Sequence, residues 1–350
     1  MSDTVHTRPL HELRAADEER FGGKSTSLGE LMAAEIPVPP GFAIATSAFH
    51  AFLEAGGLEA RIAEAMAAVK PDDVTTVQAA ADAIRAAVCA TEVPADVRAQ
   101  IAAAYADLGE PAVAVRSSAV GEDSGEATFA GQQETYLWVR GADGVCDAVR
   151  DCWASTFSAP AMSYRAKMAA DRRPEMGVTV QLMVDAAVSG VMFTCNPVSG
   201  DPSVVAIDAS WGLGLGVVGG EVTPDQYLVS KVTGEVVRRS VSAKHVEYRA
   251  DPSGHGTVCV PVEEARQSEP CLDDAQLAAL VDVARRVQKY FGAHQDVEWA
   301  LASDDAALFV VQSRPVTATG AKKDDAAAEK PASALSLVMS KFGATGGGGG

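Results

Sequence analysis

The stretch from Ala112 to Val139 constrains this chain most, because it joins two apolar segments through a long polar loop. Its sequence is AVAVRSSAVGEDSGEATFAGQQETYLWV, and both ends are predicted to be buried strands. Arg116 and two serines follow the first strand, and small residues and carboxylates continue through Gly131 to Thr135. A fixed cation, hydroxyls and unhindered backbone N–H groups are suited to polyphosphate. The pattern predicts either a phosphate-covering loop or an ordinary solvated hairpin connection.

Composition is that of a globular protein with an acidic surface. The 350 residues are enough for about two domains of ~150 residues each. The apolar fraction of 47% argues against disorder over most of the length. The formal net charge of −18 disfavours a nucleic-acid or membrane partner, so an anionic ligand would need a metal ion or clustered arginines.

Neither a metal-binding cysteine framework nor an export signal is expected. The six cysteines show no CxxC spacing and no pairing with nearby histidines, which disfavours structural zinc and a disulfide framework. The N-terminal segment MSDTVHTRPLHELRAADEERF lacks an apolar signal core, and no apolar run is long enough to span a membrane. We therefore expect a cytoplasmic protein.

A second candidate phosphate-binding element is the N-terminal segment FGGKSTSLGELMAA. Gly22-Gly23 predicts a tight turn, and Ser25 or Ser27 is expected to cap a helix with Lys24 at its entrance. An amine beside the free N–H groups of a helix N-terminus can bind phosphate. The segment is not a Walker A loop, because that motif requires a glycine where this chain has Glu18. An ordinary surface lysine is the alternative.

Apolar periodicity places the remaining elements. Predicted helices span residues 47–56, 58–108 with breaks at Pro71 and Pro94, 143–157, 159–170 and 273–291. Predicted strands span residues 42–46, 178–184, 189–194, 204–209, 296–301 and 308–315, with a hairpin between 226 and 241.

The predicted strand VTVQLMV carries one polar residue, Gln181. A buried amide needs hydrogen-bond partners, and this one could serve an adenine or a ribose. Met183 and Val184 at the strand end could offer backbone groups and an apolar face to the same ligand.

Three glycines after the strand at 204–209 match the dinucleotide-binding pattern GxGxxG; they are Gly214, Gly216 and Gly219. We reject a Rossmann site, because a further glycine and then Thr223-Pro224-Asp225 interrupt the chain before the required helix could form. A close approach between backbones, or of backbone to ligand, explains the glycines better.

A strand pair near residue 305 supplies the second half of the candidate site. If the hairpin centres on Asp305, Glu298 and Gln312 face each other with Cβ atoms ~5 Å apart. Their oxygens could bind one Mg²⁺, which typically takes one or two protein oxygens and leaves its other positions to water and phosphates. Arg314 lies two residues further on the same side and could bind an adjacent phosphate. A solvated edge hairpin is the alternative.

Taken together, these segments resemble the ATP-binding N-terminal domain of the phosphoenolpyruvate synthase, pyruvate phosphate dikinase and rifampin phosphotransferase family. The similar segments are GGKSTSLGEL, AVRSSAVGEDSGEATFAGQQETYL, VQLMVDAAVSGVMFTCNPVSGD, WGLG with VTPDQY, and DVEWAL with VVQSRPV. They cover roughly residues 8–317 in the family's order. The resemblance implies a two-lobed α+β ATP-grasp fold with the nucleotide between the lobes. The expected parts are a lobe at 1–195 with a helical region at 47–109, a lobe at 196–317 with the metal-ligand hairpin, and a flexible tail at 318–350.

The resemblance also implies a role for each candidate residue toward ATP and Mg²⁺. By this resemblance, Lys24, Arg116 and Arg314 contact the phosphates, and Gly131 and Thr135 belong to the loop that covers them. Gln181, Met183 and Val184 face the adenine. Glu298 and Gln312 are the magnesium ligands. The lysine and the two arginines would act catalytically by stabilising charge on the phosphoryl group in flight.

In this family ATP typically pyrophosphorylates a histidine on a separate swivelling domain. AMP leaves, phosphate is hydrolysed off, and the phosphohistidine phosphorylates a final acceptor. Here Leu215 stands where the family often has Glu, and none of the six histidines lies in the family's glycine- and threonine-rich phosphohistidine motif. We expect no C-terminal barrel within this sequence, and residues 335–342 of the tail are a candidate docking helix.

We therefore expect a dikinase-type phosphotransferase subunit that is incomplete without a partner carrying the histidine, similar to the arrangement in phenylphosphate synthase. The final acceptor would be pyruvate, a phenol or another small hydroxyl compound. Two alternatives stay open: an ATP-grasp ligase that forms ADP, and a non-catalytic nucleotide-binding regulatory subunit.

Overall fold

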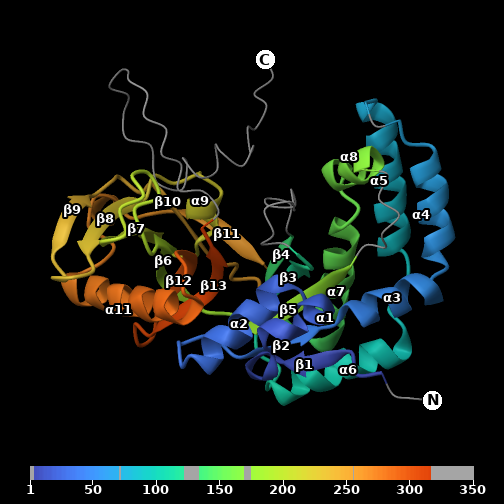
Figure 1. Cartoon of the computed structure of the whole chain (residues 1–350), viewed down its shortest axis with the longest axis horizontal. Helices are drawn as coiled ribbons and strands as arrows, with labels where there is room; N and C mark the ends of the chain where they lie inside the picture. The colour runs from blue at the N-terminus through green and yellow to red at the C-terminus, as the bar shows by residue number, and fades with distance from the viewer. Residues whose placement is uncertain (1–3, 71, 122–133, 169–174, 255, 317–350) are drawn as a thin grey trace. The chain divides into compact units, whose positions relative to one another are not determined.

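The computed structural model describes residues 4–70, 72–121, 134–168, 175–254 and 256–316. Helices and antiparallel sheets make up these residues, which confirms the α+β class (Figure 1). The chain divides into two compact units, the first made of Met1–Glu30 and Pro40–Met183 and the second of Leu31–Pro39 and Val184–Gly350. The units thus divide at 183/184, and not at 195/196 as we expected, because the strand after Val184 pairs only with strands of the second unit.

A five-stranded antiparallel sheet forms the centre of the first unit, in the order β1-β2-β5-β3-β4. Its strands are β1 (Thr7–Pro9), β2 (Gly41–Ile44), β3 (Val113–Ala119), β4 (Thr135–Val139) and β5 (Met176–Leu182). β3 is buried as predicted, but the prediction that β4 is buried is wrong. β4 lies at the sheet edge and has one strand neighbour, so its side chains stay partly exposed.

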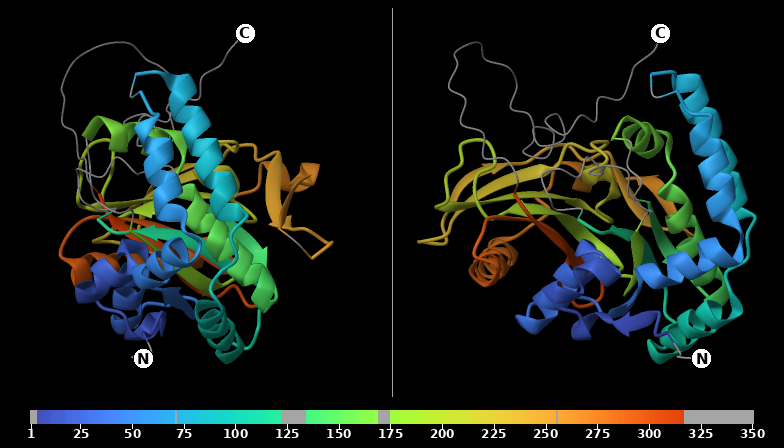
Figure 2. Two further views of the ribbon diagram at one scale, coloured as in Figure 1. Left: turned by 90° about the vertical axis from the view of Figure 1, so that its right-hand side faces the viewer. Right: turned by 45° about the vertical axis from the view of Figure 1, so that its right-hand side comes forward.

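Helices lie on both faces of this sheet: the larger core is on the face of Val178 and Val180, whereas the helix that begins at Gly23 contacts Thr179 on the opposite face. They are α1 (Glu18–Phe21), α2 (Gly23–Ala33), α3 (Thr46–Ala55), α4 (Leu58–Ala67), α5 (Val74–Cys89), α6 (Ala95–Asp107), α7 (Ala142–Ser155) and α8 (Ala159–Met168), with short 3₁₀ turns at Leu10–Glu12 and Ala15–Asp17. α4 and α5 lie side by side (Figure 2). Trp153 of α7 is fully buried and packs with ring centroids 5.7 Å from Phe49 and 5.0 Å from Phe52 of α3. This aromatic cluster joins α3 and α7 over the sheet.

A six-stranded antiparallel sheet forms the second unit, in the order β13-β12-β6-β7-β8-β9. Its strands are β6 (Ala186–Phe193), β7 (Val204–Trp211), β8 (Asp225–Ser230), β9 (Val236–Ser240), β12 (Gln295–Ala302) and β13 (Leu308–Pro315). A separate two-stranded sheet pairs β10 (Val246–Ala250) with β11 (Thr257–Pro261), and two short helices are α9 (Leu215–Val218) and α10 (Glu264–Gln267). α11 (Asp274–Phe291) lies along one face of the large sheet (Figure 1).

The helix predicted at 273–291 and the predicted hairpins are confirmed. The Asp273 side chain accepts from the Gln276 backbone N–H at the start of α11, and Gly292 ends the helix with φ +68°. β8 and β9 form the hairpin around Thr233-Gly234, and β12 and β13 form the one centred near Asp305. Local capping and alternation are therefore sufficient to place these elements.

The glycine-rich segment after β7 is not a Rossmann motif, although one reason for rejecting it needs correction. A single helical turn, α9, does form before the interruption that we expected to prevent a helix. The neighbouring strands β7 and β8 are antiparallel, whereas a Rossmann site needs a parallel β-α-β unit. A Cβ on Gly212 would lie 2.4 Å from the carbonyl oxygen of Tyr248, so a close backbone approach explains this glycine.

Replacing Gly22 by alanine is expected to lower the free energy of unfolding by roughly 3 kcal/mol. Gly22 has φ +78°, and a Cβ there would lie 2.0 Å from the Ser118 carbonyl oxygen. Gly57→Ala is the matched control, because its φ is also positive but nothing lies within 4 Å; it should cost only about 1 kcal/mol. Urea denaturation of both variants measures the difference, and equal costs would contradict the steric argument.

All six cysteines have free thiols, as expected from their spacing. Among the helices of the described residues, none has the length and apolarity needed to cross a membrane.

Candidate nucleotide site

Lys24 is buried in the first turn of α2. α1 ends at Phe21, Gly22 turns the chain, and α2 begins at Gly23. The Lys24 side chain is only 6% exposed, and its Nζ donates to the Ser117 carbonyl oxygen at 3.0 Å. The alternative of an ordinary surface lysine is therefore wrong.

Ser25 holds the N-terminal turn of α2 against the sheet. Its hydroxyl lies 2.7 Å from the Thr179 hydroxyl, and its backbone N–H donates to the Ser118 hydroxyl at 3.1 Å. The prediction that Ser25 or Ser27 caps the helix is wrong, because both lie within it. The hydroxyl cluster with Ser118 and Thr179 was missed from the sequence, and the Ser117-Ser118 pair was the only signal for it.

The register of the five-stranded sheet groups three candidate residues on one face. Arg116 of β3 lies opposite Thr135 of β4 and opposite Thr179 of β5. Gln181 follows Thr179 by two residues, so its side chain points to the same face, and it is 1% exposed. Because the Ser25 hydroxyl contacts the Thr179 hydroxyl, the first turn of α2, which carries Lys24, lies on the same sheet face as Arg116, Thr135 and Gln181.

The other first-unit candidates are less informative. Gly131 lies outside the described residues. Met183 follows the end of β5, is half-buried, and its N–H donates to the Ala112 carbonyl oxygen at 2.9 Å. Val184 is half-buried and begins the second unit, and the strand predicted to reach it ends at Leu182.

A polar cluster that the sequence did not reveal anchors the start of β4. Glu134 precedes Thr135 and forms an ion pair with Arg85 of α5, with 3.5 Å between nitrogen and oxygen. Tyr136 donates its hydroxyl to Glu134 at 3.0 Å. Burial, and secondarily the Glu134 carboxylate, raises the pKa of Tyr136, so its proton stays on the phenol. The cluster ties Thr135 to the helical region.

In the second unit, Glu298 of β12 lies opposite Gln312 of β13, which confirms the predicted register. A bulge follows Glu298 and shifts the pairing toward the turn. Both side chains are half-buried, so their oxygens can reach a ligand on this face. Within the described part of the chain, no three His, Cys, Asp or Glu side chains form a metal cluster. A carboxylate opposite an amide still fits Mg²⁺, which needs few protein ligands when phosphates complete its shell.

Asp296 is a further polar residue of this hairpin that we had not singled out. It lies opposite Arg314, which donates Nε to its Oδ2 at 2.9 Å and approaches the same oxygen with a terminal nitrogen at 2.8 Å. Burial raises the pKa of Asp296, while the Arg314 guanidinium opposes that shift. Asp296 thereby holds Arg314 on the face that carries Glu298 and Gln312.

Comparison with known proteins identifies the class of this arrangement. The sequence matches the family described as "Pyruvate phosphate dikinase, AMP/ATP-binding domain" over residues 18–334. The chain therefore belongs to this family.

Curated relatives agree with this assignment. Phosphoenolpyruvate synthase of Pyrococcus furiosus is 38% identical over 365 residues, covering 92% of this chain and 44% of that protein. A probable phosphoenolpyruvate synthase of Methanothermobacter thermautotrophicus is 39% identical, covering 89% of this chain and 46% of that protein. Rifampicin phosphotransferase of a Streptomyces species is 42% identical, covering 88% of this chain and 35% of that protein. The chain spans less than half the length of each of these relatives.

Proposed function

We propose that this chain binds Mg²⁺ and ATP and transfers a pyrophosphoryl group to a histidine on a partner polypeptide, releasing AMP. The phosphohistidine formed after loss of phosphate would then phosphorylate a small hydroxyl acceptor such as pyruvate or a phenol. Membership in an AMP/ATP-binding family whose relatives include a phosphoenolpyruvate synthase and a rifampicin phosphotransferase supports ATP-dependent phosphotransfer.

The observation that carries the proposal is the buried amine of Lys24, which donates to the carbonyl oxygen of the residue that follows Arg116 in β3. Burying a lysine side chain costs free energy. Lys24 lies in the first turn of α2, and its amine donates to a main-chain carbonyl of β3. An anionic ligand suits this position, because the helix N-terminus and the Arg116 guanidinium both favour negative charge. Phosphate groups of ATP have the required charge and size.

The proposed transfer step exchanges one P–O bond for one P–N bond. A nitrogen of the partner's histidine attacks the β-phosphorus of ATP, and the bond from that phosphorus to the oxygen bridging to the α-phosphate breaks. AMP leaves with this oxygen. Lys24, Arg116 and Arg314 would stabilise the charge that develops on the transferred group, because phosphoryl transfer depends mainly on positioning and electrostatics.

The remaining candidate residues would orient the nucleotide. Glu298 and Gln312 would hold Mg²⁺, which supplies charge neutralisation to the phosphates. Gln181 would offer its amide to the adenine or ribose, with Met183 and Val184 contributing main-chain groups and apolar contact. Gly131, outside the described residues, would belong to the loop that covers the phosphates, and Thr135, which was expected in that loop, lies at the start of β4 and would border it.

Product analysis tests the proposal. The native complex is purified from its source and incubated with Mg²⁺ and ATP, and nucleotides and phosphate are quantified by ion-exchange chromatography. We expect AMP and inorganic phosphate to form in equal amounts, together with a co-purifying subunit that carries an acid-labile phosphohistidine. Formation of ADP would favour the ligase alternative, and nucleotide binding without products would favour the regulatory alternative; either result overturns the proposal.

A further inference from the structure

We infer that Asp225 and Lys244 are positioning residues for the glycine-rich segment 212–220, which borders the candidate magnesium ligands on the same sheet face. The part of the inference that concerns nucleotide binding rests on the proposed function. It concerns the second unit alone, where every contact that carries it lies.

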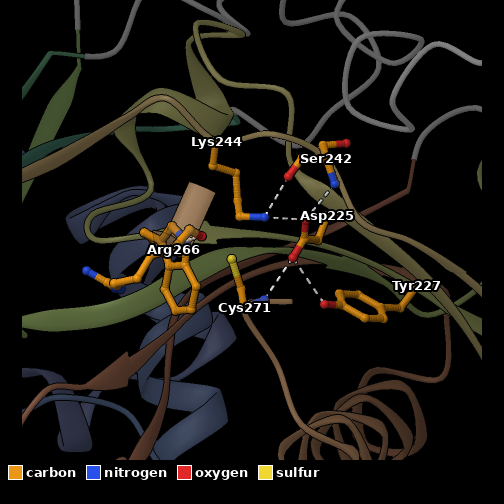
Figure 3. Close-up of polar contacts among 7 residues, drawn as sticks. Asp225, Tyr227, Ser242, Lys244, Arg266 and Cys271 are labelled. Carbon is orange, nitrogen blue, oxygen red and sulfur yellow. Dashed lines mark hydrogen bonds and ion pairs between the residues drawn. The ribbon is translucent and has the colours of Figure 1, made fainter. Parts of the chain in front are cut away.

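Asp225 and Lys244 form a fully buried ion pair in this unit (Figure 3). Lys244 Nζ lies 2.6 Å from Asp225 Oδ1, and both side chains are 0% exposed. Asp225 Oδ1 also accepts from the Ser242 N–H at 2.9 Å, while Oδ2 accepts from the Cys271 N–H at 2.8 Å and the Tyr227 hydroxyl at 3.3 Å. Lys244 Nζ donates as well to the Ser242 carbonyl oxygen at 2.8 Å.

The pair therefore joins three chain segments that lie far apart in the sequence. Asp225 begins β8, Lys244 lies just before β10, and Cys271 lies just before α11. Burial is the largest cause that raises the pKa of Cys271 and of Tyr227, so the thiol and the phenol stay neutral around the ion pair. Each carboxylate oxygen of Asp225 thus has two partners, and its ion pair with Lys244 holds the chain just before β10.

From Lys244 the structure continues to the glycine-rich segment through two routes. Its Nζ lies 6.0 Å from the ring centroid of Trp211, and the Arg266 guanidinium carbon lies 4.4 Å from the same ring. Trp211 is the last residue of β7 and directly precedes Gly212. By the second route, the Tyr248 carbonyl of β10 accepts from the Leu213 N–H at 2.8 Å. Both routes hold the start of the segment.

The segment is in turn held beside the candidate metal ligands. Ser189 of β6 donates its hydroxyl to the Gly212 carbonyl oxygen at 2.6 Å. Val217 of α9 packs in one buried cluster with Val191 of β6, and Val191 lies opposite Glu298 in the ladder. Residues opposite each other in a ladder point to the same face, so α9 lies on the face that carries Glu298. A displaced α9 would change the surroundings of any phosphate held there.

Stability alone does not account for a fully buried ion pair. Removing two charges from water costs several kcal/mol per ion, and an apolar pair of similar volume is often equally stable. An ion pair whose geometry is fixed by further hydrogen bonds can instead specify one arrangement of the segments that it joins. We therefore expect stability and nucleotide binding to respond differently when the charges are removed together.

The first experiment compares three forms of the intact complex. One carries Lys244→Met, one carries both Asp225→Asn and Lys244→Met, and one is unmodified. Hydrogen exchange measured by mass spectrometry on peptides covering 211–222 should be faster in both variants, because the Leu213 amide loses its fixed partner. Asp274→Asn is the matched control; it removes an exposed ion pair with Arg239 in the same unit and should leave this exchange unchanged. If neither charge variant folds, Tyr227→Phe, which removes one donor from Asp225, makes the same test. Unchanged exchange in the folded variants overturns the inference.

The second experiment measures thermal unfolding and the dissociation constant for Mg·ATP in the same set. The double variant should be more stable than the Lys244→Met variant, because it leaves no unpaired buried charge. Both variants should nevertheless bind Mg·ATP at least tenfold more weakly than the unmodified protein, since a misplaced site can cost ~10²-fold. If binding recovers together with stability, the pair is merely structural and the inference is wrong. If the unmodified protein does not bind Mg·ATP, the proposed function fails, and the exchange result still decides whether the pair fixes the segment.

Discussion

Glu298→Ala is expected to lower magnesium-dependent turnover of ATP by ~10²–10³-fold and to remove the magnesium dependence of nucleotide binding. Glu298 is the only carboxylate in the pair that it forms with Gln312 across the β12–β13 ladder. Alanine leaves a single neutral oxygen donor, which holds a strongly hydrated cation poorly. The measurement is ATP turnover by the complex and a magnesium titration of nucleotide affinity.

Two controls make this prediction specific. Asp304→Ala removes an exposed carboxylate at the turn of the same hairpin and should leave turnover and magnesium affinity unchanged. Glu298→Gln keeps the volume and an oxygen but removes the charge, so its defect should be smaller than that of alanine or equal to it. Unchanged ATP affinity and turnover in Glu298→Ala would show that the metal ligands lie elsewhere.

The hairpin that carries Glu298 illustrates what the sequence can predict. The side-chain alternation of strands and the length of the connection determine the register, so the pairing of Glu298 with Gln312 followed from counting residues. The ion pair between Asp296 and Arg314 follows from the same register, yet we did not predict it. An aspartate at a buried strand position opposite an arginine is the signal that could have revealed it.

Other features depend on contacts that local patterns do not contain. The burial of Lys24 depends on β3 and β5, which follow it by about ninety residues or more along the chain. The Asp225–Lys244 pair depends on a loop returning from β9 to the start of β8, so neither residue stands out in the sequence. The edge position of β4, and with it the partial exposure of its side chains, follows from strand order, which periodicity does not encode.

Lys24→Met is expected to weaken binding of Mg·ATP and to lower turnover by about 10²-fold, while costing only about 1 kcal/mol in the free energy of unfolding. Methionine keeps the length and apolar volume of the side chain, so the packing of α2 is retained. The variant loses the hydrogen bond to the Ser117 carbonyl oxygen and one positive charge beside Arg116. Lys289→Met, at an exposed position in the last turn of α11, is the control for loss of a lysine charge and should change neither quantity. Calorimetric titration with ATP measures the affinity, and urea denaturation measures the free energy of unfolding. If Lys24 only stabilised the fold, the variant's affinity for ATP would fall in proportion to its stability. A Lys24→Met variant that binds ATP like the unmodified protein would exclude the amine from the phosphate site and leave it a purely structural link between α2 and β3.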